Sequence, residues 1–227
     1  METKHYLKSA EYAFGATLAI IALLFASFWS FEPKVGKAQV DSEFTIKQTI
    51  LSEVSFLVDA NDVNLANISG ITGGESNGTT TAVVLTNNGS GYNMTISFFD
   101  NGFDHAMLGD TTYSSLYNYP AASPTFGFNT ATTAALFGYT VSDGGSGDVA
   151  APFLSTGSVC GSGGGNFGCW MEPQFAPYTI VNSSGATDPT GATTTIAFKV
   201  FVPNNPDPVV ASDTYTATAT LTATVNP

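Results

Sequence analysis

Threonines alternate with apolar residues at the end of the chain, from Asp213 to Val225. Successive side chains of a strand point to opposite faces, so a period of two predicts a strand with one buried face and one threonine face. Threonine is β-branched and favours the extended backbone. The segment is therefore predicted to be the closing strand of a β-sandwich. Its apolar positions are Tyr215, Ala217, Ala219, Leu221, Ala223 and Val225.

Further strands are predicted between residue 40 and this closing strand. No stretch there has helical periodicity, and Gly, Pro and Asn clusters separate short alternating runs. This pattern predicts an all-β fold, an immunoglobulin-like antiparallel β-sandwich preceded by an N-terminal hydrophobic export or anchor helix. The first expected segment, Phe44–Val58, is either one long strand or two strands joined at a bend near Leu51. The other expected strands are Ile68–Ile71, Thr79–Thr86, Tyr92–Phe98, Thr125–Phe128, Ala135–Val141, Tyr178–Val181 and Ile196–Val202.

Three connecting segments carry specific expectations. Asn87–Gly91 contains Asn-Gly, which accepts positive φ readily and predicts a hairpin between the strands on either side. The Gly-Gly-Glu-Ser-Asn-Gly run at Gly73–Gly78 predicts a turn. Asp100–Pro124 lacks alternation, which predicts a long surface excursion with a short helical turn at Tyr113–Tyr117.

The N-terminal segment is typical of an export signal. A basic start, Met1–Lys8, precedes an uncharged apolar run over residues 12–31. The run is long enough for a membrane span, while Gly36 and Ala38 fit a signal-peptidase site that would leave Gln39 as the new N-terminus. Cleaved signal and retained anchor both stay open. We expect a leader at residues 1–38, one extracellular sandwich domain at residues 39–227, and membrane contact only through residues 12–31 if the leader stays.

Charge is scarce and predominantly negative. The chain has six lysines and no arginine, and from Gln39 onward 15 carboxylates accompany only Lys47 and Lys199. Phosphate backbones are bound by Lys and Arg, so this composition argues against nucleic-acid binding. An anionic surface favours the solubility of a secreted protein.

Two segments resemble known surface proteins. The ending Asp-Thr-Tyr-Thr-Ala-Thr-Ala-Thr-Leu-Thr-Ala-Thr at 213–224 and the stretch Val83–Ile96 resemble the WxL class of bacterial cell-surface domains. Tyr92-Asn-Met94 stands where that class has Trp-x-Leu. The resemblance implies a secreted surface β-sandwich attached non-covalently to peptidoglycan. The ending is also similar to spore-coat-U and archaic chaperone–usher pilin subunits.

Cys160 and Cys169 are the two cysteines of the chain, separated by a glycine-rich loop. Both fall in the segment predicted to be exported, where an oxidising environment favours a disulfide. A redox role is expected to need Cys-x-x-Cys spacing, and a zinc site needs more ligands. We therefore predict a structural disulfide.

Aromatic residues are the candidate contact residues. Trp170 follows the second cysteine and is expected either to pack on the bridge or to face a partner or glycan. With Tyr113, Tyr117 and Tyr119 it forms the predicted aromatic contact set for a carbohydrate.

Catalysis and metal binding have weaker support in the sequence. His105 is the sole histidine after the leader, and neither a Gly-x-Ser-x-Gly elbow nor a selected carboxylate pair accompanies it. We predict that the chain is not an enzyme and has no cofactor. Asp59–Asn64 and Asp143–Asp148 offer oxygen ligands, so calcium is the alternative, although neither has EF-hand spacing.

Three hypotheses follow for function. The first is an exported, non-enzymatic bacterial cell-surface β-sandwich protein with a structural, wall-associated or adhesive role, whose partner is a cell-wall polymer, a glycan or another surface protein. The second is a pilin-like subunit that self-assembles by strand addition, with Phe44–Val58 as the donated strand. The third is a secreted carbohydrate-binding module.

Overall fold

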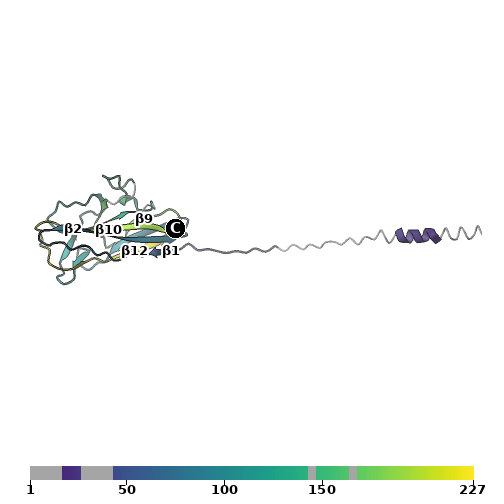
Figure 1. Ribbon diagram of the computed structural model, residues 1–227, viewed down its shortest axis with the longest axis horizontal. Helices are drawn as coiled ribbons and strands as arrows, with labels where there is room; N and C mark the ends of the chain where they lie inside the picture. The colour runs from purple at the N-terminus through teal and green to yellow at the C-terminus, as the bar shows by residue number, and fades with distance from the viewer. Residues whose placement is uncertain (1–16, 27–42, 143–146, 164–167) are drawn as a thin grey trace, which may run out of the picture. The chain divides into compact units, whose positions relative to one another are not determined.

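Two facing β-sheets form the part of the chain that begins at Ile50 in the computed structural model (Figure 1), which describes residues 17–26, 43–142, 147–163 and 168–227. All strand pairs are antiparallel except β5 with β7. The first sheet has the order β1 (Val54–Val58), β2 (Gly74–Thr86), β10 (Ala192–Val202), β7 (Leu136–Ser142), β5 (Ser115–Asn118), β4 (Met107–Gly109) and β11 (Tyr215–Thr216). The second has the order β12 (Ala219–Val225), β3 (Tyr92–Phe98) and β9 (Tyr178–Asn182). A small pair, β6 (Thr125–Phe126) with β8 (Cys169–Trp170), and the short 3₁₀ helix η1 (Ala151–Phe153) complete the fold.

The core lies between the inner faces of the two sheets. Met94 and Ile96 of β3 pack there with residues of β7 and β10. The Phe98 ring meets the Phe137 ring edge-on at 6.0 Å between centroids. Every second residue of β3 is fully buried, as strand alternation requires. The all-β class and the sandwich predicted from period-two patterning are therefore confirmed.

The predicted closing strand is divided between the two sheets. β11 pairs with β4 in the first sheet, and β12 pairs with β3 in the second. The chain crosses from one sheet to the other at Ala217 and Thr218, where Thr218 accepts a hydrogen bond from the Phe99 N–H. The alternation of burial is interrupted at the crossing, because Tyr215, Ala217, Leu221 and Ala223 pack on the core whereas Ala219 is exposed. Val225, predicted on the same apolar face, is also exposed.

The predicted hairpin at Asn87–Gly91 is wrong, because β2 and β3 lie in different sheets. Both edges of β2 are already paired, one with β1 and one with β10, so β3 has no free edge to join. The loop instead carries the chain across the sandwich. The buried Asn88 amide holds it by donating to the carbonyls of Gly91 and Asn226 at 2.8 and 2.7 Å.

The predicted turn at Gly73–Gly78 is also wrong, because β2 begins at Gly74 and pairs with β10 from there. Gly78 lies within this strand, directly beneath Val63 and Leu65. A Cβ at Gly78 would lie 2.4 Å from Val63 Cγ1. The glycine therefore marks a close approach of another segment, not a turn. The short strand expected at Ile68–Ile71 is a bridge and turn, with Ser69 pairing Gly73.

The predicted Phe44–Val58 strand is formed only at its end, as β1. Its pairing starts at Val54 opposite Thr86, the last residue of β2, so no strand backbone remains for earlier residues. The side chain of Asn87 takes over there, accepting from the Glu53 N–H at 2.8 Å and donating to the Leu51 carbonyl at 3.0 Å. Residues 43–53 have no regular secondary structure.

The predicted excursion at Asp100–Pro124 contains two strands of the first sheet. β4 pairs with β5, and β5 pairs with β7. No helical turn forms at Tyr113–Tyr117, because β5 begins at Ser115. These strands are too short to show alternation, so the sequence pattern does not predict them.

Of the apolar run predicted at residues 12–31, the structure describes residues 17–26, which are helical. Among all described residues, no helix has both the length and the apolar character needed to cross a membrane. The rest of the run and the predicted cleavage site before Gln39 lie outside the described residues.

Candidate functional site

The predicted disulfide between Cys160 and Cys169 is confirmed. The sulfur atoms are 2.05 Å apart and the Cα atoms 5.8 Å apart. Cys169 begins β8 and is fully buried, and Cys160 pairs with Ser155 in an isolated bridge. The bond thus ties the β8 strand to the segment that follows η1 and supports a structural role.

Two of the four predicted contact aromatics lie in a cluster on the outer face of the first sheet. Tyr119 is 3% exposed, and its ring centroid lies 4.5 Å from that of Phe128. The Trp170 ring meets Phe128 edge-on at 5.2 Å. The Tyr119 hydroxyl donates to the Gly127 carbonyl at 3.0 Å and accepts from the Asn129 N–H. These contacts fix Tyr119 and Trp170 as packing residues.

The other two aromatics are accessible to solvent. Tyr117 is 40% exposed, and its ring contacts the His105 ring at 4.4 Å between centroids and a tilt of 42°. Tyr113 is 66% exposed and has a φ of 53°, in the left-handed region that bulky residues rarely adopt. Of the four rings, Tyr119 is therefore buried and Trp170 partly buried, whereas Tyr113 and Tyr117 are exposed.

Lys199 lies beside the Phe128 and Trp170 rings, a placement that the sequence did not predict. Its Nζ is 3.1 Å from Glu75 Oε2, 5.4 Å from the Phe128 ring centroid and 5.6 Å from the Trp170 centroid. The lysine side chain is 16% exposed. Both rings and the carboxylate compensate the burial of the ammonium group, so this lysine helps to anchor the outer aromatic layer.

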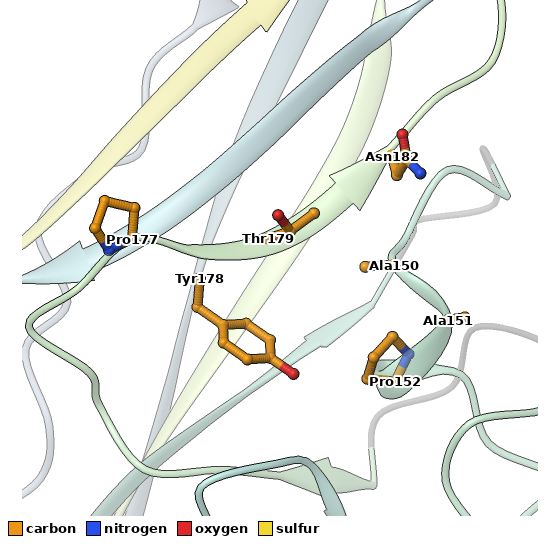
Figure 2. Close-up of a pocket in the computed structure, with 7 residues that line it drawn as sticks. All are labelled: Ala150, Ala151, Pro152, Pro177, Tyr178, Thr179 and Asn182. Atoms are coloured by element: carbon orange, nitrogen blue, oxygen red, sulfur yellow. The ribbon is translucent and has the colours of Figure 1, made fainter. Parts of the chain in front are cut away.

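A hollow of about 510 Å³ opens beside β9 (Figure 2). Its lining comes from the η1 region and from β9, and Figure 2 shows the Tyr178 ring reaching from the strand toward Pro152. Burial raises the pKa of the Tyr178 hydroxyl above its ordinary value. The lining contains no carboxylate, amine or imidazole. It consists of Ala150, Ala151, Pro152, Pro177, Tyr178, Thr179 and Asn182.

A second hollow, of about 240 Å³, lies where β3 ends and β4 and β11 pair. Phe99 and Tyr113 line it, together with the polar side chains of Asn101, Asp110 and Thr216. The Asp110 carboxylate accepts a hydrogen bond from the Thr216 hydroxyl at 3.0 Å. This hollow combines exposed aromatic rings with hydrogen-bonding groups.

A carboxylate clamp holds the loop beside this second hollow. Asp213 accepts hydrogen bonds from the backbone N–H and the hydroxyl of both Thr111 and Thr112, at 2.7–3.0 Å. The bonds from Thr112 and Thr111 stabilise the ionised form and hold the pKa of Asp213 well below its usual range. The loop that carries Tyr113 is therefore fixed against the start of β11.

Metal ligands do not gather in the part of the chain that the structure describes: no three His, Cys, Asp or Glu residues lie close enough there to hold an ion. The predicted calcium loop at Asp59–Asn64 runs beside β2, where the Asn61 N–H donates to the Thr80 hydroxyl at 2.7 Å. The other predicted loop, Asp143–Asp148, lies largely outside the described residues.

Comparison with known proteins adds no relative. No protein-family model matches the chain, and no curated protein sequence matches it.

Proposed function

We propose that the chain is an exported, non-enzymatic β-sandwich protein of a bacterial cell surface, with a structural or adhesive role. The Cys160–Cys169 bond is the observation that supports this most directly. Disulfides persist in oxidising compartments and are rare in the reducing cytosol. The basic start and the apolar run at residues 12–31 supply the matching export signal.

The polar groups with the strongest interactions serve to hold the fold. Asp213 clamps a loop, the Lys199 ammonium anchors an aromatic layer, and the Asn88 amide fixes the crossing between the sheets. A fold held by such polar contacts suits a protein that persists outside the cell. A structural or adhesive role requires a domain that stays folded in this way.

Protease treatment of intact cells tests this proposal. Digestion of whole cells should remove the folded domain from a tagged full-length chain, while a cytosolic marker protein stays intact. If the tagged domain survives until the cells are lysed, the proposal is contradicted.

A second function, self-assembly by strand addition, is favoured by one specific observation. Phe44, Ile46 and Ile50 alternate along an extended segment and are 82%, 83% and 81% exposed. An exposed segment with strand periodicity and few charges tends to pair with a strand edge. Val54–Val58 is held in its own sheet, so the donated strand would be residues 44–50 and not the whole of Phe44–Val58.

The acceptor would be the free edge of β12 in a second copy. β12 ends the order of the second sheet and lies beside β1, the end strand of the first sheet, as Figure 1 shows. Along this seam Phe56 and Leu221 are only partly buried. Within one copy, the Asn87 side chain accepts from the Glu53 N–H and donates to the Leu51 carbonyl.

Light scattering of the full-length exported protein tests strand addition. Charges on the apolar face, in the variant Ile46→Asp/Ile50→Asp, should convert oligomers into monomers. The matched control Thr49→Asp places a charge on the opposite face and should leave the oligomers intact. A wild-type protein that is monomeric at micromolar concentration would exclude this second function.

A further inference from the structure

The hollow lined by Phe99 and Tyr113 presents two large rings to solvent. Phe99 is 67% exposed and Tyr113 is 66% exposed, whereas the neighbouring Phe98 is buried in the core. In the free protein these exposed rings gain no free energy from burial. A ligand that covers them removes their apolar surface from water, which favours binding. The pair is therefore suited to stacking against a ligand face.

Both rings are attached to backbone that is held in place. The Phe99 N–H donates to the Thr218 carbonyl at 2.9 Å, which ties it to the crossing between β11 and β12. The Tyr113 N–H donates to the Gly109 carbonyl. The two residues before Tyr113, Thr111 and Thr112, donate their backbone N–H groups to the Asp213 carboxylate. A preorganised site loses less conformational entropy on binding than a mobile one.

Hydrogen-bonding groups line the same hollow. Asp110 accepts from the Thr216 hydroxyl through Oδ1, and a carboxylate has capacity for further donors. Thr218 and Asn101 also line the hollow, and the Asn101 amide donates to the His105 carbonyl and accepts from the Phe103 N–H. Alternating apolar faces and hydroxyl donors are the chemistry of a sugar ring, which stacks through its C–H face and donates from its rim.

Charge and size narrow the ligand class. The net charge of −12 and the Asp110 carboxylate disfavour anionic polymers. The volume of about 240 Å³ is below the roughly 300–1,000 Å³ of clefts that hold drug-sized ligands. A single sugar ring fits this space better than a large compact ligand, and the rest of a chain would lie along the surface.

We propose that the hollow of Phe99, Tyr113 and Asp110 binds one ring of a neutral polysaccharide. This inference deepens the proposed surface role, on which it rests, by naming the class of partner. It also assigns glycan contact to Phe99 and Asp110, with Tyr113 as the one member shared with the predicted aromatic set.

Affinity electrophoresis of the purified full-length protein tests the site. The gels contain mannan, dextran, xyloglucan or soluble chitin oligomers, and hyaluronan serves as the anionic comparison. Tyr113→Gly removes a ring and suits the positive φ, so the fold is retained. Phe99→Ser removes the other ring, and Asp110→Asn keeps an acceptor for Thr216 while removing the charge. Ile71→Ser, at a residue that is 70% exposed elsewhere, is the matched control.

The expected result is retardation by at least one neutral polysaccharide, weakened about fivefold to tenfold by Tyr113→Gly and by Phe99→Ser. Asp110→Asn should weaken it less, and Ile71→Ser should leave it unchanged. Retardation by hyaluronan alone, retardation by no polysaccharide, or equal retardation of wild type and Tyr113→Gly would each overturn the proposal. These outcomes leave the cellular location untouched, so a failed site is distinguishable from a failed export proposal.

Discussion

The Asp213 carboxylate accepts two hydrogen bonds from Thr112, one from its backbone N–H and one from its hydroxyl, both at 2.7 Å. The clamp links residues about a hundred positions apart and fixes the loop that carries Tyr113 to the start of β11. The stability of this corner of the sandwich should therefore depend on the ionised state of one side chain.

Asp213→Asn should lower the melting temperature at neutral pH by a few degrees. The melting temperature of the variant should also fall less steeply as the pH is lowered. The hydrogen bonds lower the pKa of Asp213 in the folded protein, so the ionised form contributes stability above the ordinary aspartate pKa of about 3.9. That contribution is lost as the pH falls below this value toward the lower folded pKa. Thermal melts of both proteins between pH 7 and pH 2 measure the effect. Parallel curves would contradict it.

Replacing both cysteines by serine should destabilise the domain by about 2.5 kcal/mol, the chain-entropy value for a loop of this length. The bond joins residues nine positions apart, so the loop that it closes is short. Urea unfolding of the double variant and of the wild type gives the difference. A loss below about 1 kcal/mol would mean that the bond does not constrain the unfolded chain as expected.

Lys199→Ala should destabilise the fold by about 1–2 kcal/mol, because it removes contacts with two aromatic rings and an apolar stem. Glu75→Gln should cost less than about 1 kcal/mol, since the Glu75 side chain is 53% exposed. A double-mutant cycle between Lys199 and Trp170 isolates the ring contact. A coupling energy of zero would show that the ammonium group gains nothing from the rings.

Gly78→Ala should destabilise by about 1–3 kcal/mol, because the added methyl group would collide with Val63 and Leu65. Gly89→Ala is the matched control, since a Cβ there meets nothing within 4 Å. Chemical denaturation of both variants compares them. Equal stability of the two variants would contradict the close approach of the 63–65 segment to β2.

The sequence predicted the strands better than their partners. Period-two alternation located Tyr92–Phe98 because this strand buries one face in the core, whereas the strand at Leu136–Ser142 buries both faces and was located by its apolar and β-branched residues. Alternation carries no information on which edge a strand joins, so Asn87–Gly91 appeared to be a hairpin turn although β2 had both edges occupied. The pairing was decided by contacts distant in sequence.

The candidate sites were predicted less well than the disulfide. The number and spacing of the cysteines were enough to predict the disulfide. The exposure of the aromatic rings depends on how the outer layer packs, which the sequence pattern does not show. Tyr119 is buried because the Phe128 ring packs on it and its hydroxyl donates to the Gly127 carbonyl, and strand periodicity does not predict such a contact. In the sequence, Lys199 is one polar residue of an alternating strand pattern. Its contacts with Trp170 and Glu75 arise only in the folded chain.

Mass spectrometry of the native protein tests the central claim of export most directly. Thiols are alkylated before cell lysis, and the intact mass and the peptide joining Cys160 to Cys169 are then measured. The account predicts an oxidised pair in a chain recovered from the envelope or medium, starting either at Gln39 or at the intact leader. A cytosolic chain with both cysteines alkylated would contradict it.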